Sequence, residues 1–164
     1  MGSSKANCTK TGYFSNDQIE FPSEERMKKR AVAVIECCQE IPCNPCMEYC
    51  PFGAITVEDN INAIPVIDFE KCTGCGICLG FCPGLAIFMV DLSKEDYGIV
   101  TIPYEIEPPG EGENVDLLNR AGDVVGEGEI LKVKKLKQHD RTLSISLKME
   151  KELVKSVRGF RRKK

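Results

Sequence analysis

Residues 72–83 read Cys72-Thr-Gly-Cys75-Gly-Ile-Cys78-Leu-Gly-Phe-Cys82-Pro83, which is the spacing C-x2-C-x2-C-x3-C-P. Bacterial chains use this spacing to hold iron–sulfur clusters through cysteine thiolates. Three thiolates two residues apart, from Cys72, Cys75 and Cys78, are expected to cover one face of a compact cage. The fourth, Cys82, lies three residues further on and is followed by a proline, so we expect it to point elsewhere.

A second and less regular packet precedes this one, and it reads Cys43-Asn-Pro-Cys46-Met-Glu-Tyr-Cys50-Pro51. The regular spacing would place its first cysteine at position 40, where the sequence has Glu40. The missing ligand must then come from Cys37 or Cys38, across a loop of five or four residues. The pattern Cys-Pro-x-x-Ala-Ile ends both packets, which indicates an internal duplication.

Together the two packets make residues 31–92 resemble the bacterial ferredoxins with two [4Fe-4S] clusters. In those proteins the fourth cysteine of each packet ligates the other cluster. The resemblance implies an α+β fold, a duplicated ferredoxin-like βαββαβ unit. It also implies two ligand sets, Cys37, Cys43, Cys46 and Cys82 for one cluster and Cys72, Cys75, Cys78 and Cys50 for the other. Similar ferredoxin-like subunits read E-C-x5-C-N-P-C, which favours Cys37 over its alternative, Cys38.

Ten cysteines in 164 residues would also fit a secreted disulfide scaffold or structural zinc. The small and polar residues Met1 to Lys10 do not form the apolar segment of a signal peptide. Zinc favours two packets of two ligands, whereas residues 72–78 supply three in one packet. Thiolates need a reducing compartment, so we expect a cytoplasmic protein, and no apolar run is long enough for insertion into a membrane.

The ferredoxin-like segment is flanked by sequence of different character. Residues 1–30 are a polar arm with one isolated cysteine, Cys8, and a short helix is expected to start at Ser23. Residues 98–148 contain several short strand patterns, which predict a small antiparallel β domain, a barrel or a sandwich. Residues 149–164 are predicted to form an amphipathic C-terminal helix over 149–159 and a basic tail.

No catalytic group is predicted, because the one histidine, His139, lies in a polar segment and is expected to be solvated. The predicted function is electron transfer, by an iron–sulfur subunit of an oxidoreductase complex. Resemblance to subunits of flavin-dependent amino-acid or amine dehydrogenases implies a flavoprotein partner. The alternatives are a free soluble ferredoxin and, from another class, a nucleic-acid-associated protein with structural clusters. Only the basic tail suggests the nucleic-acid-associated alternative. The net charge of the whole chain, −3, argues against it.

Overall fold

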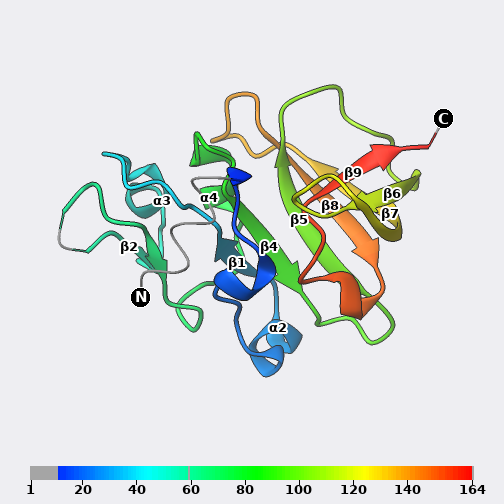
Figure 1. The fold of residues 1–164 in the computed structure, drawn as a ribbon, viewed down its shortest axis with the longest axis horizontal. Helices are drawn as coiled ribbons and strands as arrows, with labels where there is room; N and C mark the ends of the chain where they lie inside the picture. The colour runs from blue at the N-terminus through cyan, green and yellow to red at the C-terminus, as the bar shows by residue number, and fades with distance from the viewer. Residues whose placement is uncertain (1–10, 59, 164) are drawn as a thin grey trace.

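A single antiparallel sheet of seven strands runs through the protein, whose structure is a computed structural model that describes residues 11–58 and 60–163. The strand order is β1-β4-β5-β8-β7-β6-β9, and every neighbouring pair is antiparallel (Figure 1). The strands are β1 (Val32–Ile35), β4 (Ile87–Asp91), β5 (Gly98–Tyr104), β6 (Asn114–Leu118), β7 (Val124–Lys134), β8 (Leu143–Met149) and β9 (Gly159–Arg162).

Smaller elements gather at one end of this sheet, where both cysteine packets lie. Strands β2 (Ile55–Thr56) and β3 (Val66–Ile67) pair as an antiparallel hairpin, and the short helices α3 (Pro45–Glu48) and α4 (Ile77–Phe81) lie beside it (Figure 1). From β1 to β4 the elements follow the order β-α-β-β-α-β along the chain. This is the predicted order, although the duplicated ferredoxin fold itself stays a prediction.

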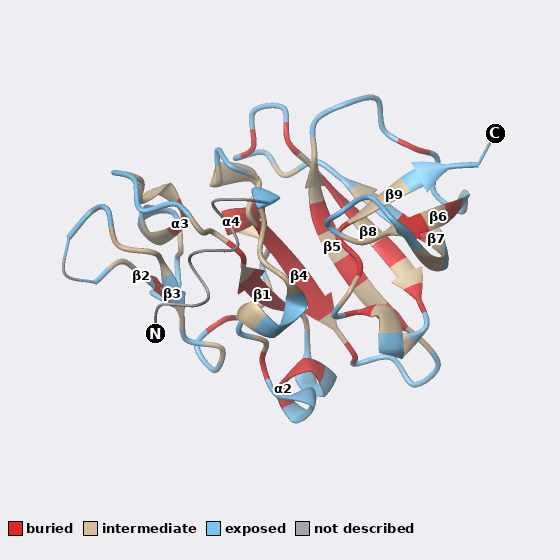
Figure 2. Ribbon diagram, viewed as in Figure 1, coloured by how far each residue is buried: buried red, intermediate tan, exposed pale blue. Residues whose placement is uncertain are grey.

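The strands bury their side chains according to their place in the sheet. Four consecutive residues of β4, Ile87 to Val90, are buried, as expected for a strand that is covered on both faces. In β5 and β6 the buried residues alternate with partly exposed ones, so one face of each strand lines the core. The buried residues form a continuous band through β1, β4, β5 and β8 (Figure 2).

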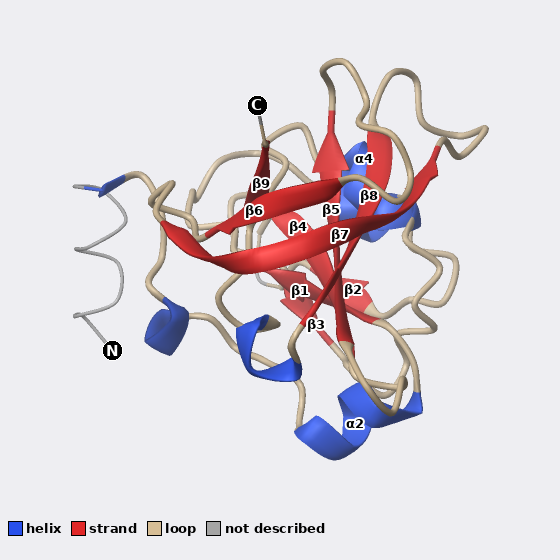
Figure 3. Cartoon of the chain, turned by 90° about the vertical axis from the view of Figure 1, so that its right-hand side faces the viewer, coloured by secondary structure: helices blue, strands red, loops and turns tan. Residues whose placement is uncertain are grey.

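The far half of the sheet is strongly twisted, and β6 and β7 run across β5 and β8 (Figure 3). The register of β7 against β8 shifts between Ile130 and Lys132, and the register of β6 against β7 shifts between Leu117 and Leu118. Such irregularities increase the local twist of a sheet. Residues 98–148 therefore form antiparallel strands as predicted, but these strands continue the sheet that starts with β1 and β4. The limits of the predicted domains stay untested.

The C-terminal helix predicted over residues 149–159 is wrong. Met149 is the last residue of β8, a single 3-10 turn, η2 (Lys151–Leu153), follows, and the chain then forms β9. Val154 and Val157 in this segment are buried. A turn followed by an extended strand buries the same side chains, and it also lets β9 pair with β6 along the edge of the sheet.

The N-terminal segment packs against the ferredoxin-like part. The 3-10 turn η1 (Asn16–Gln18) precedes helix α2 (Glu24–Lys29), which begins where predicted, with Ser23 accepting a hydrogen bond from the amide of Arg26. Met27 in this helix is fully buried, and its carbonyl accepts a hydrogen bond from the amide of Leu92. The isolated Cys8 and the start of the predicted arm, residues 1–10, lie outside the described residues.

Candidate iron–sulfur sites

Two cavities, each lined by four cysteine thiols, lie at the end of the molecule that holds α3 and α4. The first has a volume of about 300 Å³ and is lined by the free cysteines Cys37, Cys43, Cys46 and Cys82, and also by Cys38. The second is far smaller, about 20 Å³, and is lined by Cys50, Cys72, Cys75 and Cys78. Each cavity thus takes cysteines from both packets, which is the grouping that the predicted crossed ligand sets require. That these side chains ligate clusters stays a prediction.

Cys37 and Cys38 both line the first cavity, but their sulfur atoms are in different chemical states. Cys37 is a free thiol, whereas Cys38 is engaged in a disulfide bond. A disulfide sulfur cannot act as a thiolate ligand. The structure therefore favours Cys37 over Cys38 as the ligand that precedes Cys43 in the first set, and this choice stays a prediction.

The two short helices position cysteines for both cavities. Helix α3 starts at Pro45, which occupies the first helical turn, and it carries Cys46. Helix α4 carries Cys78 and ends at Phe81, and its C-cap residue, Cys82, lines the other cavity. The ring of Tyr49, directly before Cys50, stacks on the ring of Phe81, directly before Cys82, with centroids 3.7 Å apart. This contact holds the two crossing cysteines at a fixed separation.

Two glycines in the second packet have backbone conformations that other residues rarely adopt. Gly74 and Gly76 both have φ of 77°. A β-carbon at position 74 would lie 2.4 Å from the carbonyl oxygen of Ala31, so the backbone of β1 approaches here as closely as only glycine allows. Gly76 is the N-cap of α4 and turns the chain into that helix.

Backbone amides donate hydrogen bonds to three of the cysteine sulfurs. The amide of Ala54 lies 3.3 Å from the sulfur of Cys50, and the amide of Ala86 lies 3.3 Å from the sulfur of Cys82. These two bonds occupy the same place in the two copies of Cys-Pro-x-x-Ala, so the repeated alanine was the signal that would have predicted them. A third bond, from Ala33 to Cys72, joins residues far apart in the sequence. Amide donors of this kind stabilise negative charge on a cluster.

Burial makes several of these thiols hard to ionise without a cation. It raises the pKa of Cys46 to about 11, and the neighbouring Cys82 adds to the effect. Burial also raises the pKa of Cys78, with Cys72 and Cys75 as further causes. Positively charged iron would supply the compensation that these thiolates need, so the donor set fits iron–sulfur clusters. Among the described residues no three potential ligands converge on a single metal ion; in a four-iron cage each cysteine binds a different iron.

A buried group of charges borders the first cavity. Glu36, directly before Cys37, forms ion pairs with Arg120 and with Arg158, whose Nε lies 3.2 Å from its carboxylate. The guanidinium of Arg158 also lies 3.7 Å from the centroid of the Phe88 ring. Burial lowers the pKa of Arg158 to about 9, and the nearby Arg120 contributes. Sequence analysis missed this group, because it joins residues more than 80 positions apart.

The basic tail pairs with the chain's own carboxylates. The guanidinium of Arg161 lies 3.0 Å from Asp116, and that of Arg162 lies 2.7 Å from Glu113. Lys163 lies 2.6 Å from Glu127. These residues belong to β9 and its neighbours or lie next to them, so the tail is an edge of the sheet.

The prediction that His139 is solvated is wrong. Its side chain is buried, and Nε2 lies 2.9 Å from the carbonyl oxygen of Ile77 at the start of α4. The imidazole occupies the space that a β-carbon at Gly80 would fill, and it meets the ring of Phe81 edge-on. His139 therefore supports the helix that carries Cys78, and the polar sequence around it hid this role.

Comparison with known proteins agrees with this geometry. Residues 65–88 match the family of 4Fe-4S binding domains, and this range contains the second packet. An uncharacterized ferredoxin of Methanocaldococcus jannaschii is 39% identical over 84 residues, which are 50% of this chain and 52% of the relative. These matches support a ferredoxin-like iron–sulfur protein. The polyferredoxin-like subunit of the aliphatic sulfonate oxidoreductase of Pyrococcus furiosus is 31% identical over 81 residues, which are 47% of this chain and 46% of the relative.

Shorter similarity extends to another complex. The PorD subunit of the pyruvate synthase of Methanocaldococcus jannaschii is 42% identical over 54 residues, which are 33% of this chain and 60% of the relative. The chain spans about half the length of the first two relatives. No solved structure matches it significantly. Within the described ranges, no helix is both long and apolar enough to cross a membrane.

Proposed function

We propose that the protein transfers electrons through two [4Fe-4S] clusters, as the iron–sulfur subunit of a multi-subunit oxidoreductase. The observation that carries this proposal is the pair of cavities at one end of the molecule, each lined by four free thiols drawn from both packets. A bound [4Fe-4S] cluster supplies one-electron chemistry, and four cysteine ligands leave no position for a substrate. The chain is therefore no catalyst on its own.

The residues around the cavities hold and shield such clusters. The cysteines bind, and the amides of Ala33, Ala54 and Ala86 stabilise the charge on their sulfurs. The stacked rings of Tyr49 and Phe81 fix the spacing between the two sites. The first cavity, at about 300 Å³, is larger than the second, at about 20 Å³.

The names of the relatives support membership in a complex. A polyferredoxin-like subunit of a sulfonate oxidoreductase and a subunit of pyruvate synthase both belong to larger oxidoreductases. The additional strands β5 to β9 go beyond what two clusters require, which favours a subunit over a free soluble ferredoxin. The partner that we propose is a flavoprotein dehydrogenase subunit acting on amino acids or amines, from which the clusters would take two electrons one at a time.

A nucleic-acid-associated role has weaker support. It rests on the basic tail, in which Arg161, Arg162 and Lys163 form exposed ion pairs with carboxylates of this chain. Phosphate contacts would have to replace these pairs.

The function is tested by anaerobic co-expression of the chain with the proteins encoded next to its gene. We expect a stable hetero-oligomer that contains a bound flavin, and we expect substrate added to it to reduce the clusters. A complex without flavin whose clusters are still reduced would keep the subunit proposal and overturn the flavoprotein partner. If the chain stays monomeric with every neighbour, yet exchanges electrons with pre-reduced viologen, the subunit proposal is wrong and the protein is a free soluble ferredoxin.

A further inference from the structure

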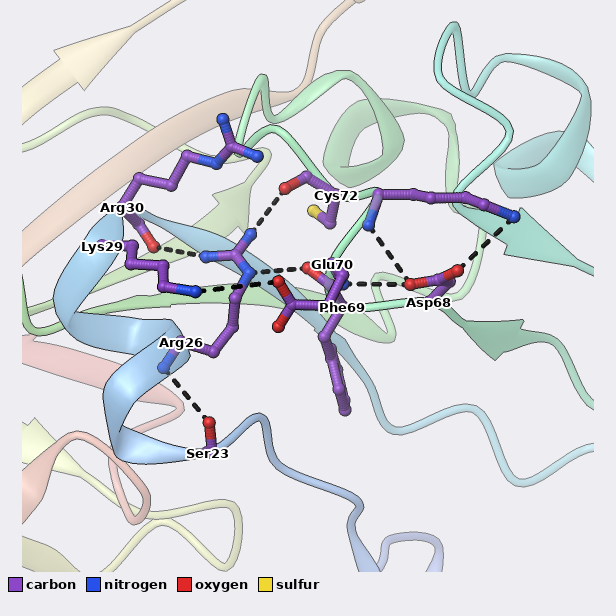
Figure 4. A network of polar contacts seen from close by, with 9 residues as sticks. Ser23, Arg26, Lys29, Arg30, Asp68, Phe69, Glu70 and Cys72 are labelled. Atoms are coloured by element: carbon purple, nitrogen blue, oxygen red, sulfur yellow. Dashed lines mark hydrogen bonds and ion pairs between the residues drawn. The ribbon is translucent and has the colours of Figure 1, made fainter.

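The side chain of Arg26 is buried next to the second packet, and no carboxylate of the described residues pairs with it. It is 2% exposed, and its three nitrogens donate hydrogen bonds only to backbone carbonyl oxygens (Figure 4). Nε lies 2.7 Å from the oxygen of Phe69, Nη1 lies 3.1 Å from the oxygen of Arg30, and Nη2 lies 2.5 Å from the oxygen of Cys72. No carboxylate within the described part of the chain contacts this guanidinium.

The neighbouring cations are arranged differently. Lys29 faces Glu70, and Lys71 faces Asp68, and all four side chains are largely exposed (Figure 4). Arg26 alone among these three basic residues turns away from solvent. A buried charge without a counter-charge is costly, and carbonyl dipoles compensate only part of that cost. The missing negative charge should therefore lie beside the guanidinium.

A candidate for this negative charge is the predicted cage in the second cavity, which Arg26 reaches through the backbone of Cys72. Cys72 accepts a hydrogen bond from Arg26 through its carbonyl oxygen, and its thiol lines that cavity. Cys72 is itself buried, and its sulfur accepts a hydrogen bond from Ala33. On the strength of the proposed function, we propose that Arg26 is the counter-charge of the cluster held by Cys50, Cys72, Cys75 and Cys78, and that it raises the reduction potential of this cluster.

The first cavity shows the same arrangement in another form. There two guanidinium groups, of Arg120 and Arg158, share the single carboxylate of Glu36, which leaves one positive charge in excess. Each cavity thus has one uncompensated positive charge beside it, and the residues that provide it come from outside the cysteine packets. Helix α2 is accordingly a part of the second site.

The direction of the effect follows from electrostatics. Reduction transfers one electron from an external donor to the bound cluster, which gains one negative charge and needs no other reactant. A fixed positive charge nearby stabilises the reduced state more than the oxidised state, particularly where water is excluded. Removing the charge of Arg26 should therefore shift the midpoint potential of this cluster to a more negative value.

The test compares Arg26→Gln, Arg26→Lys and a control, Lys28→Gln. The control removes one positive charge from the exposed face of the same helix, where Lys28 pairs with Glu24. Iron and sulfide contents of each anaerobically purified protein are measured first. The clusters are then titrated with dithionite while EPR spectra follow their reduction. We expect Arg26→Gln to shift one of the two reduction waves to a more negative potential, Arg26→Lys to restore most of the shift, and Lys28→Gln to leave both waves in place.

Each outcome decides the inference. Unchanged waves in Arg26→Gln, or a shift no larger than in Lys28→Gln, would overturn it while the proposed function stands. If Arg26→Gln fails to assemble one cluster, assembly in Arg26→Lys supports the role of the charge. If neither variant assembles this cluster, the planar hydrogen-bonding group of Arg26 is what matters, and its proposed role as a counter-charge is overturned. A wild-type protein without redox-active clusters would overturn the proposed function, and this inference with it.

Discussion

At the scale of single residues, Gly74 shows how the backbone shapes the second site. A side chain at this position would need a left-handed conformation, which costs about 1–2 kcal/mol, and would also collide with the carbonyl oxygen of Ala31. We expect Gly74→Ala to lower the thermal unfolding midpoint and the iron content. The control is Gly84→Ala directly after the same packet, where a β-carbon meets nothing within 4 Å. Equal behaviour of the two variants would refute this account of Gly74.

The state of Cys37 and Cys38 leads to a second prediction at this scale. Cys37 is a free thiol in the first cavity, and Cys38 is in a disulfide bond. We expect Cys37→Ser to lose or convert one cluster, and we expect Cys38→Ser to keep both. Iron analysis and EPR spectra of the two variants provide the measurement. The reverse result would show that Cys38, and not Cys37, is the ligand.

At the scale of elements, a buried ion pair attaches the segment before β9 to the end of β1. Arg158→Met should cost about 3 kcal/mol, at the lower end of the range for a broken buried pair, because Arg120 still faces Glu36. The matched control is Arg161→Met, three residues further on, whose exposed pair with Asp116 should contribute about 0–1 kcal/mol. Urea unfolding of both variants tests this, and a similar loss in the two would contradict the importance of burial.

The same elements show what sequence reasoning can reach. Helix α2 was predicted, because its capping residue Ser23 is local, and the order of the elements from β1 to β4 was implied by the resemblance to the two-cluster ferredoxins. The segment 149–162 was not, because Val154 and Val157 fit the spacing of a helix as well as a turn and a strand. Only the free edge of β6 decides between them, and pairing with a distant strand leaves no local pattern.

At the scale of the whole molecule, the cysteine packets and the charges around them differ in how far they could be predicted. The spacing of ligands within a packet is local, whereas the crossed groups of four were implied by the resemblance to the two-cluster ferredoxins. The buried charges of Arg26 and Glu36 depend on contacts across 46 and 122 positions, and nothing near them in the sequence marks them as buried. His139 escaped prediction for the same reason.

The central claim is that this one chain carries two four-iron clusters in cavities built from both packets. The measurement that tests it most directly is the iron, zinc and acid-labile sulfide content of the anaerobically purified protein, together with EPR spectra after reduction. We expect about eight irons and about eight sulfides per chain, with negligible zinc, and EPR signals from two interacting clusters. About four irons per chain, or zinc in stoichiometric amount, would contradict the account.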